Sequence, residues 1–115
     1  VQMHVFADAS SEAYGAVAYV RKEGESGISC SFLMTKSGVK PLKTITIPRM
    51  ELTAATVAVK IGAMLCRELR CETVFYHTDS TSVLHFIRNK TKRFPVFVSN
   101  RVQQIVSLSE ASQWR

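Results

Sequence analysis

Two aspartates in this sequence each follow an apolar run with strand character. Asp8 closes the stretch MHVFAD, and Asp79 follows VFYHT. A carboxylate at the end of a strand adds little to packing, so each needs a role in a turn or in a site. Asp8 could cap the turn before Ser10 and Ser11, and Asp79 could be the N-cap of the next helix, because Asp is a preferred cap. Alternatively, the fold brings the two carboxylates together to hold something positive.

A third acidic residue, Glu51, lies near the start of a long helix predicted over about residues 49–70, which Pro48 opens as a suitable first residue. The polar residues of this segment recur at helical spacing and mark its solvent face: Thr53, Thr56, Lys60 and Arg67. Glu51 lies two residues from the first of these, about 200° around the helix, and so falls on the opposite stripe, which faces the sheet. The apolar residues of that stripe include Ala55, Ala58 and Leu65.

A carboxylate on a core-facing stripe is costly unless it is paired or binds a cation. Glu51 could pair with Arg49 or Arg101, and its place in the first helical turn offsets part of the cost through the helix dipole. Three carboxylates at one spot would repel one another and raise each other's pKa. A divalent cation removes that conflict, and ligation by oxygen alone suits Mg²⁺ or Mn²⁺.

The apolar pattern predicts the element order βββ-α-β-α-α and therefore an α/β fold. Strands are expected over residues 2–8, 14–22, 28–36 and 73–78, and helices over about 49–70, 80–88 and 96–108. Short turns make the first three strands an antiparallel meander, and a helical crossover normally returns the next strand parallel to its neighbour. If the fourth strand lies beside the first, Asp8 and Asp79 meet at the carboxyl ends of parallel strands, where open α/β sheets place their sites.

The composition is that of one folded domain with an anionic partner. The chain has 115 residues, of which 46% are hydrophobic and 21% are charged, enough for one core and too few for two domains. The net charge of +6 favours a polyanion. Polar residues break the longest apolar segment, so no membrane span is expected. Cys30, Cys66 and Cys71 have no metal-site spacing and are expected to be structural thiols in a reducing compartment.

A basic link after the second predicted helix is a candidate for contacts with phosphates. Its cationic residues are Arg88, Lys90, Lys92 and Arg93. They would track a nucleic-acid backbone by a salt-sensitive mechanism that is independent of base sequence. The alternative is a solvated loop with no partner. A weaker second candidate is the set Lys36, Lys40 and Lys43.

Three acidic segments carry a resemblance to a known family: FADAS…YGAVAYV, IPRMEL and TDSTSVLHFI. They resemble the motifs of the ribonuclease H domain of retroelement polyproteins. The motif sequences are most similar to those of the BEL/Pao retrotransposon group (the Pao retrotransposon peptidase family). The resemblance implies a ribonuclease H-like mixed sheet flanked by helices. It also implies that Asp8, Glu51 and Asp79 are catalytic ligands of two Mg²⁺ or Mn²⁺ ions, with Asp8 bridging both. The implied reaction is cleavage of the RNA strand of an RNA–DNA hybrid during reverse transcription.

The resemblance also implies a fourth acidic ligand, on a helix after a fifth strand. Trp114 and Arg115 look like the first residues of that strand. Residues 1–115 are therefore expected to be a single domain, the C-terminally incomplete fragment of a longer polyprotein with adjacent reverse transcriptase and integrase domains. The expected location is inside the cell, in a cytoplasmic retrotransposon particle or the nucleus.

Selection of RNA requires contacts with 2′-hydroxyl groups across the wide minor groove of an A-like duplex. The candidate readers are the backbone amides near Ser10 and Ser11, the carboxylate of Glu51, and Ser80.

Two other functions compete with the nuclease hypothesis. One is a catalytically degenerate ribonuclease H-like module that binds nucleic acid or spaces its neighbours. The other is an aspartic peptidase, which uses paired Asp-Thr/Ser-Gly turns. Here DAS and DST lack the glycine, and a helical glutamate has no role in that chemistry. The intact acidic triad favours the nuclease.

Overall fold

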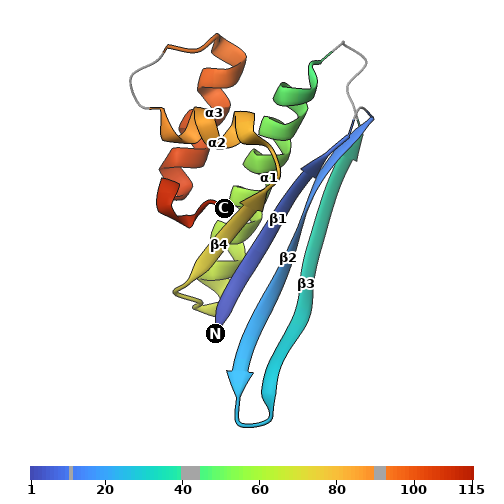
Figure 1. Ribbon diagram of the computed structural model, residues 1–115, viewed down its shortest axis with the longest axis vertical. Helices are drawn as coiled ribbons and strands as arrows, with labels where there is room; N and C mark the ends of the chain where they lie inside the picture. The colour runs from blue at the N-terminus through green and yellow to red at the C-terminus, as the bar shows by residue number, and fades with distance from the viewer. Residues whose placement is uncertain (11, 40–44, 90–92) are drawn as a thin grey trace.

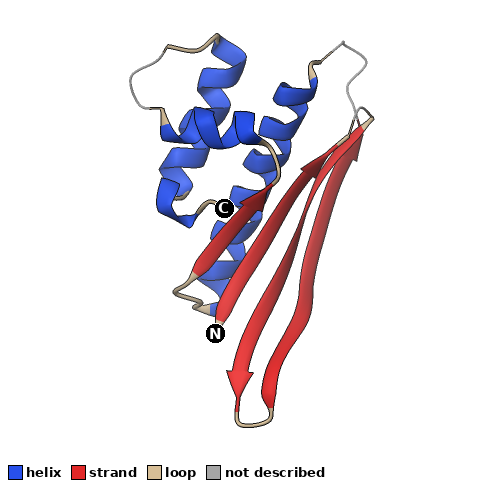
Figure 2. Cartoon of the chain, viewed as in Figure 1, coloured by secondary structure: helices blue, strands red, loops and turns tan. Residues whose placement is uncertain are grey.

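Four strands form one sheet, the longest helix lies against one of its faces, and the other two helices pack beside that helix (Figure 1 and Figure 2). The computed structural model describes residues 1–10, 12–39, 45–89 and 93–115. The strands are β1 (Gln2–Ala9), β2 (Ala13–Gly24), β3 (Gly27–Val39) and β4 (Val74–Thr78). The helices are α1 (Ile47–Leu69), α2 (Thr81–Arg88) and α3 (Val96–Leu108), followed by a short 3₁₀ turn, η1 (Ala111–Gln113). The predicted element order is confirmed.

The sheet has the strand order β3-β2-β1-β4. β1 pairs antiparallel with β2 and parallel with β4, and β2 pairs antiparallel with β3. This is the mixed sheet expected from three short-turn strands followed by a helical crossover. β2 and β3 are longer than predicted, because their hairpin continues to the pair Gly24↔Gly27. Gly27 has φ 117°, a value that favours glycine.

The core lies between the sheet and α1. The alternation predicted for β1 is confirmed, since Met3 and Val5 are fully buried while Phe6 and Asp8 are exposed. The facing side of α1 carries small and branched apolar residues, among them Leu52, Ala55, Ala58 and Val59. Alanines at this contact let the helix approach the sheet closely. None of the helices in the described ranges is long and apolar enough to cross a membrane.

α1 differs from the sequence prediction in two ways. Thr56, expected on the solvent face, is buried, and its hydroxyl donates to the Leu52 carbonyl at 2.9 Å. The reason is that α1 packs against α3 as well as the sheet, so more than one of its sides is covered. The helix also begins at Ile47, and its first turn holds no acidic residue. Glu51 thus lies beyond the first turn, where the helix dipole stabilises a carboxylate less than expected.

The last residues extend the sheet beyond β4. Trp114 forms a parallel bridge with Tyr76, the Arg115 amide donates to the Tyr76 carbonyl at 2.8 Å, and the Thr78 amide donates to the Arg115 carbonyl at 3.1 Å. This pairing agrees with the expected start of a fifth strand. That residues 1–115 are a fragment of a polyprotein, with a further acidic ligand elsewhere, stays a prediction.

Candidate metal and nucleic-acid site

The two aspartates lie at the same end of the sheet, at the carboxyl ends of β1 and β4. β1 and β4 pair in parallel through Ala7↔Thr78, and Asp8 and Asp79 are the next residue of each chain segment. Both side chains are exposed to solvent. The Asp8 carboxylate accepts a hydrogen bond from the Ala9 amide at 3.0 Å. The strand register therefore puts two carboxylates at neighbouring strand ends, as the sequence predicts.

Glu51 is half-buried on α1, the helix that packs on β1 and β4. Within the described part of the chain, no three His, Cys, Asp or Glu residues form a group that could hold a metal ion with the side chains as placed. The donor set itself fits a hard cation, because all three candidates are carboxylates and Mg²⁺ prefers oxygen. Both aspartate side chains are exposed, so a cation in solvent can reach them. The three-acid metal site stays a prediction.

Each of the three acids also has a structural alternative to a metal site, and the described contacts bear on these alternatives. Asp79 is not the N-cap of α2, because Ser80 is, with its Oγ accepting from the Val83 amide at 3.1 Å. Among the described residues of the first turn, the Ser10 Oγ accepts from the amides of Glu12 and Ala13, whereas the Asp8 carboxylate accepts from its neighbour Ala9.

Glu51 makes no ion pair with another residue that the structure describes. Among the described residues, one ion pair lies within 4.0 Å, and it joins Arg21 to Glu23. The alternative in which Glu51 pairs with Arg49 or Arg101 is therefore not what the structure shows.

Two of the predicted substrate readers already serve the fold. The Ser10 amide donates to the Ala13 carbonyl at 2.8 Å, so a substrate contact by that amide would have to break this bond. Ser80 is 4% exposed and caps α2. Arg88, at the end of α2, and Arg93 are the first and last cationic residues of the basic link, and both are exposed. Three other candidates, Ser11, Lys90 and Lys92, lie outside the described residues. All these substrate roles stay predictions.

Two arginines, Arg49 and Arg101, form a cluster with Phe97. The sequence suggests these arginines only as possible ion-pair partners of Glu51. The guanidinium of Arg101, on α3, lies 3.5 Å from the ring centroid of Phe97, and that of Arg49, on α1, lies 5.0 Å from the same centroid. The Arg101 contact has a sequence signal, because the residues are four apart on one helix and so share a face. The Arg49 contact joins two helices and has no local signal.

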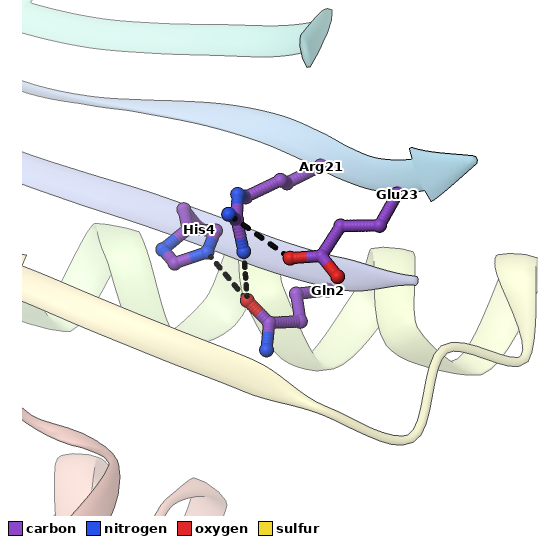
Figure 3. A network of polar contacts seen from close by, with 4 residues as sticks. All are labelled: Gln2, His4, Arg21 and Glu23. Atoms are coloured by element: carbon purple, nitrogen blue, oxygen red, sulfur yellow. Dashed lines mark hydrogen bonds and ion pairs between the residues drawn. The ribbon is translucent and has the colours of Figure 1, made fainter. Parts of the chain in front are cut away.

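The opposite end of β1 carries a separate polar network, shown in Figure 3. The Gln2 side-chain oxygen accepts from Arg21 at 3.4 Å and lies 3.2 Å from His4 Nε2. His4 Nδ1 lies 2.9 Å from His77 Nε2. Burial and then Arg21 lower the pKa of His4, and burial, then His4, then Arg115 lower the pKa of His77. The network tethers β1 to its two neighbours, far along β1 from Asp8.

Comparison with known proteins identifies the fold. The profile of the family described as the Pao retrotransposon-like RNaseH-like domain matches residues 1–80. The N-terminal RNase H domain of Rv2228c from Mycobacterium tuberculosis, solved as a fusion with maltose binding protein, aligns with a TM-score of 0.66 and 18% identity. That alignment covers 100% of this chain and 77% of the other.

A second solved structure, RNase H1 from the halophilic archaeon Halobacterium salinarum, aligns with a TM-score of 0.64 and 14% identity. It covers 99% of this chain and 82% of the other. At these identities the likeness concerns the fold, which is that of RNase H. No curated protein sequence matches the chain.

Proposed function

The chain belongs to the family of Pao retrotransposon-like RNaseH-like domains, and we propose that it is the metal-dependent endonuclease that cuts the RNA strand of RNA–DNA hybrids during retrotransposon reverse transcription. The partners that go with this proposal are the hybrid itself and adjacent reverse transcriptase and integrase domains of one polyprotein. Its location is then a retrotransposon particle in the cytoplasm or the nucleus.

One observation supports the proposal most directly. The parallel register of β1 and β4 ends at Ala7↔Thr78, so the next residues, Asp8 and Asp79, lie side by side in sequence register at the carboxyl ends of the two strands. The helix that carries Glu51 packs on both strands. This placement of the two aspartates, with Glu51 on the helix that covers their strands, supports a shared role for the three carboxylates.

In this function Asp8, Glu51 and Asp79 hold two Mg²⁺ or Mn²⁺ ions. Such ions supply an activated water and stabilise the leaving 3′-oxygen of the cleaved phosphodiester. The residues of the chain bring the acids together and orient the duplex. Asp8 and Asp79 are carried by strand ends, and Glu51 is carried by a helix that packs on the sheet. Rigid elements of this kind are the support that a precise site requires.

The test is cleavage of an end-labelled RNA–DNA hybrid in Mg²⁺ and, separately, in Mn²⁺. Asp8→Asn, Glu51→Gln and Asp79→Asn should each lower the rate at least about 10- to 100-fold, since even the loss of a group that only supports a metal ligand has that effect. The matched control is Glu68→Gln, an exposed carboxylate near the far end of α1. Circular dichroism confirms that each variant is folded. Full activity in Asp79→Asn would contradict the assignment.

The degenerate binding module is the second candidate, because the described side chains form no ready metal group. It predicts hybrid binding without cleavage in either metal, and binding that the three carboxamide variants leave unchanged. An aspartic peptidase would instead show proteolysis sensitive to pepstatin, and no observation in the structure favours it.

A further inference from the structure

We propose that Arg49, Arg101 and Phe97 form a binding site for one backbone phosphate of the nucleic-acid substrate, next to the acidic edge of the sheet. This inference rests on the proposed function, since it assumes a nucleic-acid substrate at that edge. The inference goes beyond the proposed function because it assigns a phosphate contact to a described cluster on α1 and α3 instead of to the basic link after α2.

The cluster holds two guanidinium groups in fixed places. Phe97 packs against the core, and the Arg101 guanidinium lies 3.5 Å from its ring centroid while donating to the Phe97 carbonyl at 3.2 Å. Arg49 reaches the same ring from α1 at 5.0 Å. A cation above an aromatic face is held by the charge distribution of the ring. Both side chains are therefore oriented before any ligand binds, which lowers the entropy lost on binding.

The positive charge of the cluster is not balanced. Neither arginine has an acidic partner among the residues that the structure describes, where the ion pair within 4.0 Å is Arg21 with Glu23. Burial, and then the charge of Arg49, lower the pKa of Arg101. Two like charges over one ring repel each other, and an anion between them would turn that repulsion into attraction.

The chemistry of the ligand follows from the donors. Arg101 uses one N–H on a carbonyl, which leaves the rest of its planar fork available. Guanidinium forks match the paired oxygens of a phosphate and form charge-assisted, bidentate hydrogen bonds with it. Arg49 and Arg101 are both partly exposed, so a phosphodiester backbone can reach them.

The position of the cluster places this phosphate beside the acids. Arg49 is two residues before Glu51 on α1. Tyr14 raises the pKa of Arg101, a sign of proximity, and pairs with Ala9, the neighbour of Asp8. In Figure 1 the beginnings of α1 and α3 and the carboxyl end of β1 all lie at the same end of the molecule. A duplex held here by one phosphate would pass the edge where Asp8 and Asp79 emerge.

The experiment measures binding of an RNA–DNA hybrid against salt concentration, in EDTA so that cleavage cannot occur. If both arginines grip one phosphate, Arg49→Ala and Arg101→Ala should each flatten the slope of log K against log salt by about 0.7–0.9. The double variant should flatten it no further, because the shared phosphate is already lost. The control is Arg67→Ala, an exposed arginine in the last turn of α1 that removes the same charge. It should leave the slope unchanged.

Arg101→Lys separates geometry from charge. It should keep the slope but weaken binding several-fold at fixed salt, because an ammonium lacks the planar fork. Thermal unfolding identifies any variant that fails to fold. If Arg101→Ala does not fold, the test at this residue is the weaker binding of Arg101→Lys at fixed salt. Two results together would overturn the inference. They are a wild-type salt slope in Arg49→Ala, and hybrid binding by Arg101→Lys that is as tight as that of wild type.

Failure of this inference is distinguishable from failure of the proposed function. Normal slopes combined with metal-dependent cleavage by wild type would remove the phosphate site and leave the nuclease in place. Flattened slopes in the arginine variants, without cleavage by wild type in either metal, would leave the phosphate site on a binding module.

Discussion

Replacing Gly62 with alanine should destabilise the fold, because Tyr76 fills the space that a Cβ would need. An ideal Cβ at Gly62 would lie 2.3 Å from the Tyr76 hydroxyl oxygen and 2.6 Å from Cε1. Tyr76 cannot easily give way, since it is 2% exposed and its ring stacks on Trp114 with the centroids 5.0 Å apart. Burial, and then the Cys66 thiol, raise the pKa of Tyr76 to about 12, so the packed group is a neutral phenol.

The size of the effect is a difference between two terms. Overpacking a core contact costs about 1–3 kcal/mol. Alanine in place of glycine inside a helix returns up to about 1 kcal/mol. The net loss should be about 1–2 kcal/mol, which for a domain of this size lowers Tm by about 4–8 °C. Because Gly62 sets how closely α1 approaches β4, hybrid cleavage should fall as well, even though Gly62 is remote from the acids in sequence.

The assay is denaturant and thermal unfolding of wild type and Gly62→Ala, with Gly24→Ala as the control. A Cβ at Gly24 would meet no atom within 4 Å, so this change should leave stability within about 0.5 kcal/mol of wild type, as is usual for surface substitutions. A Gly62→Ala variant at least as stable as wild type would refute the close contact between α1 and Tyr76.

Two further predictions concern residues outside the acids. The lowered pKa values of His4 and His77 mean that the unfolded chain binds more protons below their ordinary value near 6.5, so stability should fall as pH drops through that region. The unfolding midpoint of wild type should fall between pH 7.5 and 5.5 by more than that of His4→Gln/His77→Gln, and equal falls would contradict the assignment. Ser80→Ala should cost about 1 kcal/mol through loss of the α2 cap. Denaturant unfolding beside Ser99→Ala, an exposed serine on α3, checks this, and equal stability of the two variants would argue against the cap.

The elements of this fold are largely readable from local patterns. α3 was predicted over 96–108 and is found as Val96–Leu108, because its apolar stripe is regular and Pro95 precedes it. The alternation in β1 gave the correct buried face. The mixed sheet followed from connection lengths and the handedness of crossovers, which are general constraints on any chain.

What the sequence did not reveal depends on contacts between distant segments. Thr56 was misplaced because the sequence prediction treated one side of α1 as open to solvent, whereas α1 packs on α3 as well as on the sheet and Thr56 is buried. The placement of Glu51 was partly wrong because the start of α1 lies two residues earlier than the pattern indicated. For the candidate site, register brings Asp8 and Asp79 to one edge as predicted, whereas side-chain convergence on a cation depends on rotamers that no spacing rule determines.

The stack of Trp114 on Tyr76 provides an optical probe of the sheet edge. Trp114 is the single tryptophan of the chain, is 1% exposed, and donates its indole N–H to the Ser109 hydroxyl at 3.0 Å. Its fluorescence therefore arises from one apolar environment beside β4 and should shift to longer wavelength when that edge opens. Because Tyr76 lies three residues before Asp79, unlabelled protein can report on whether the segment that carries this carboxylate stays paired while metal or nucleic acid is added.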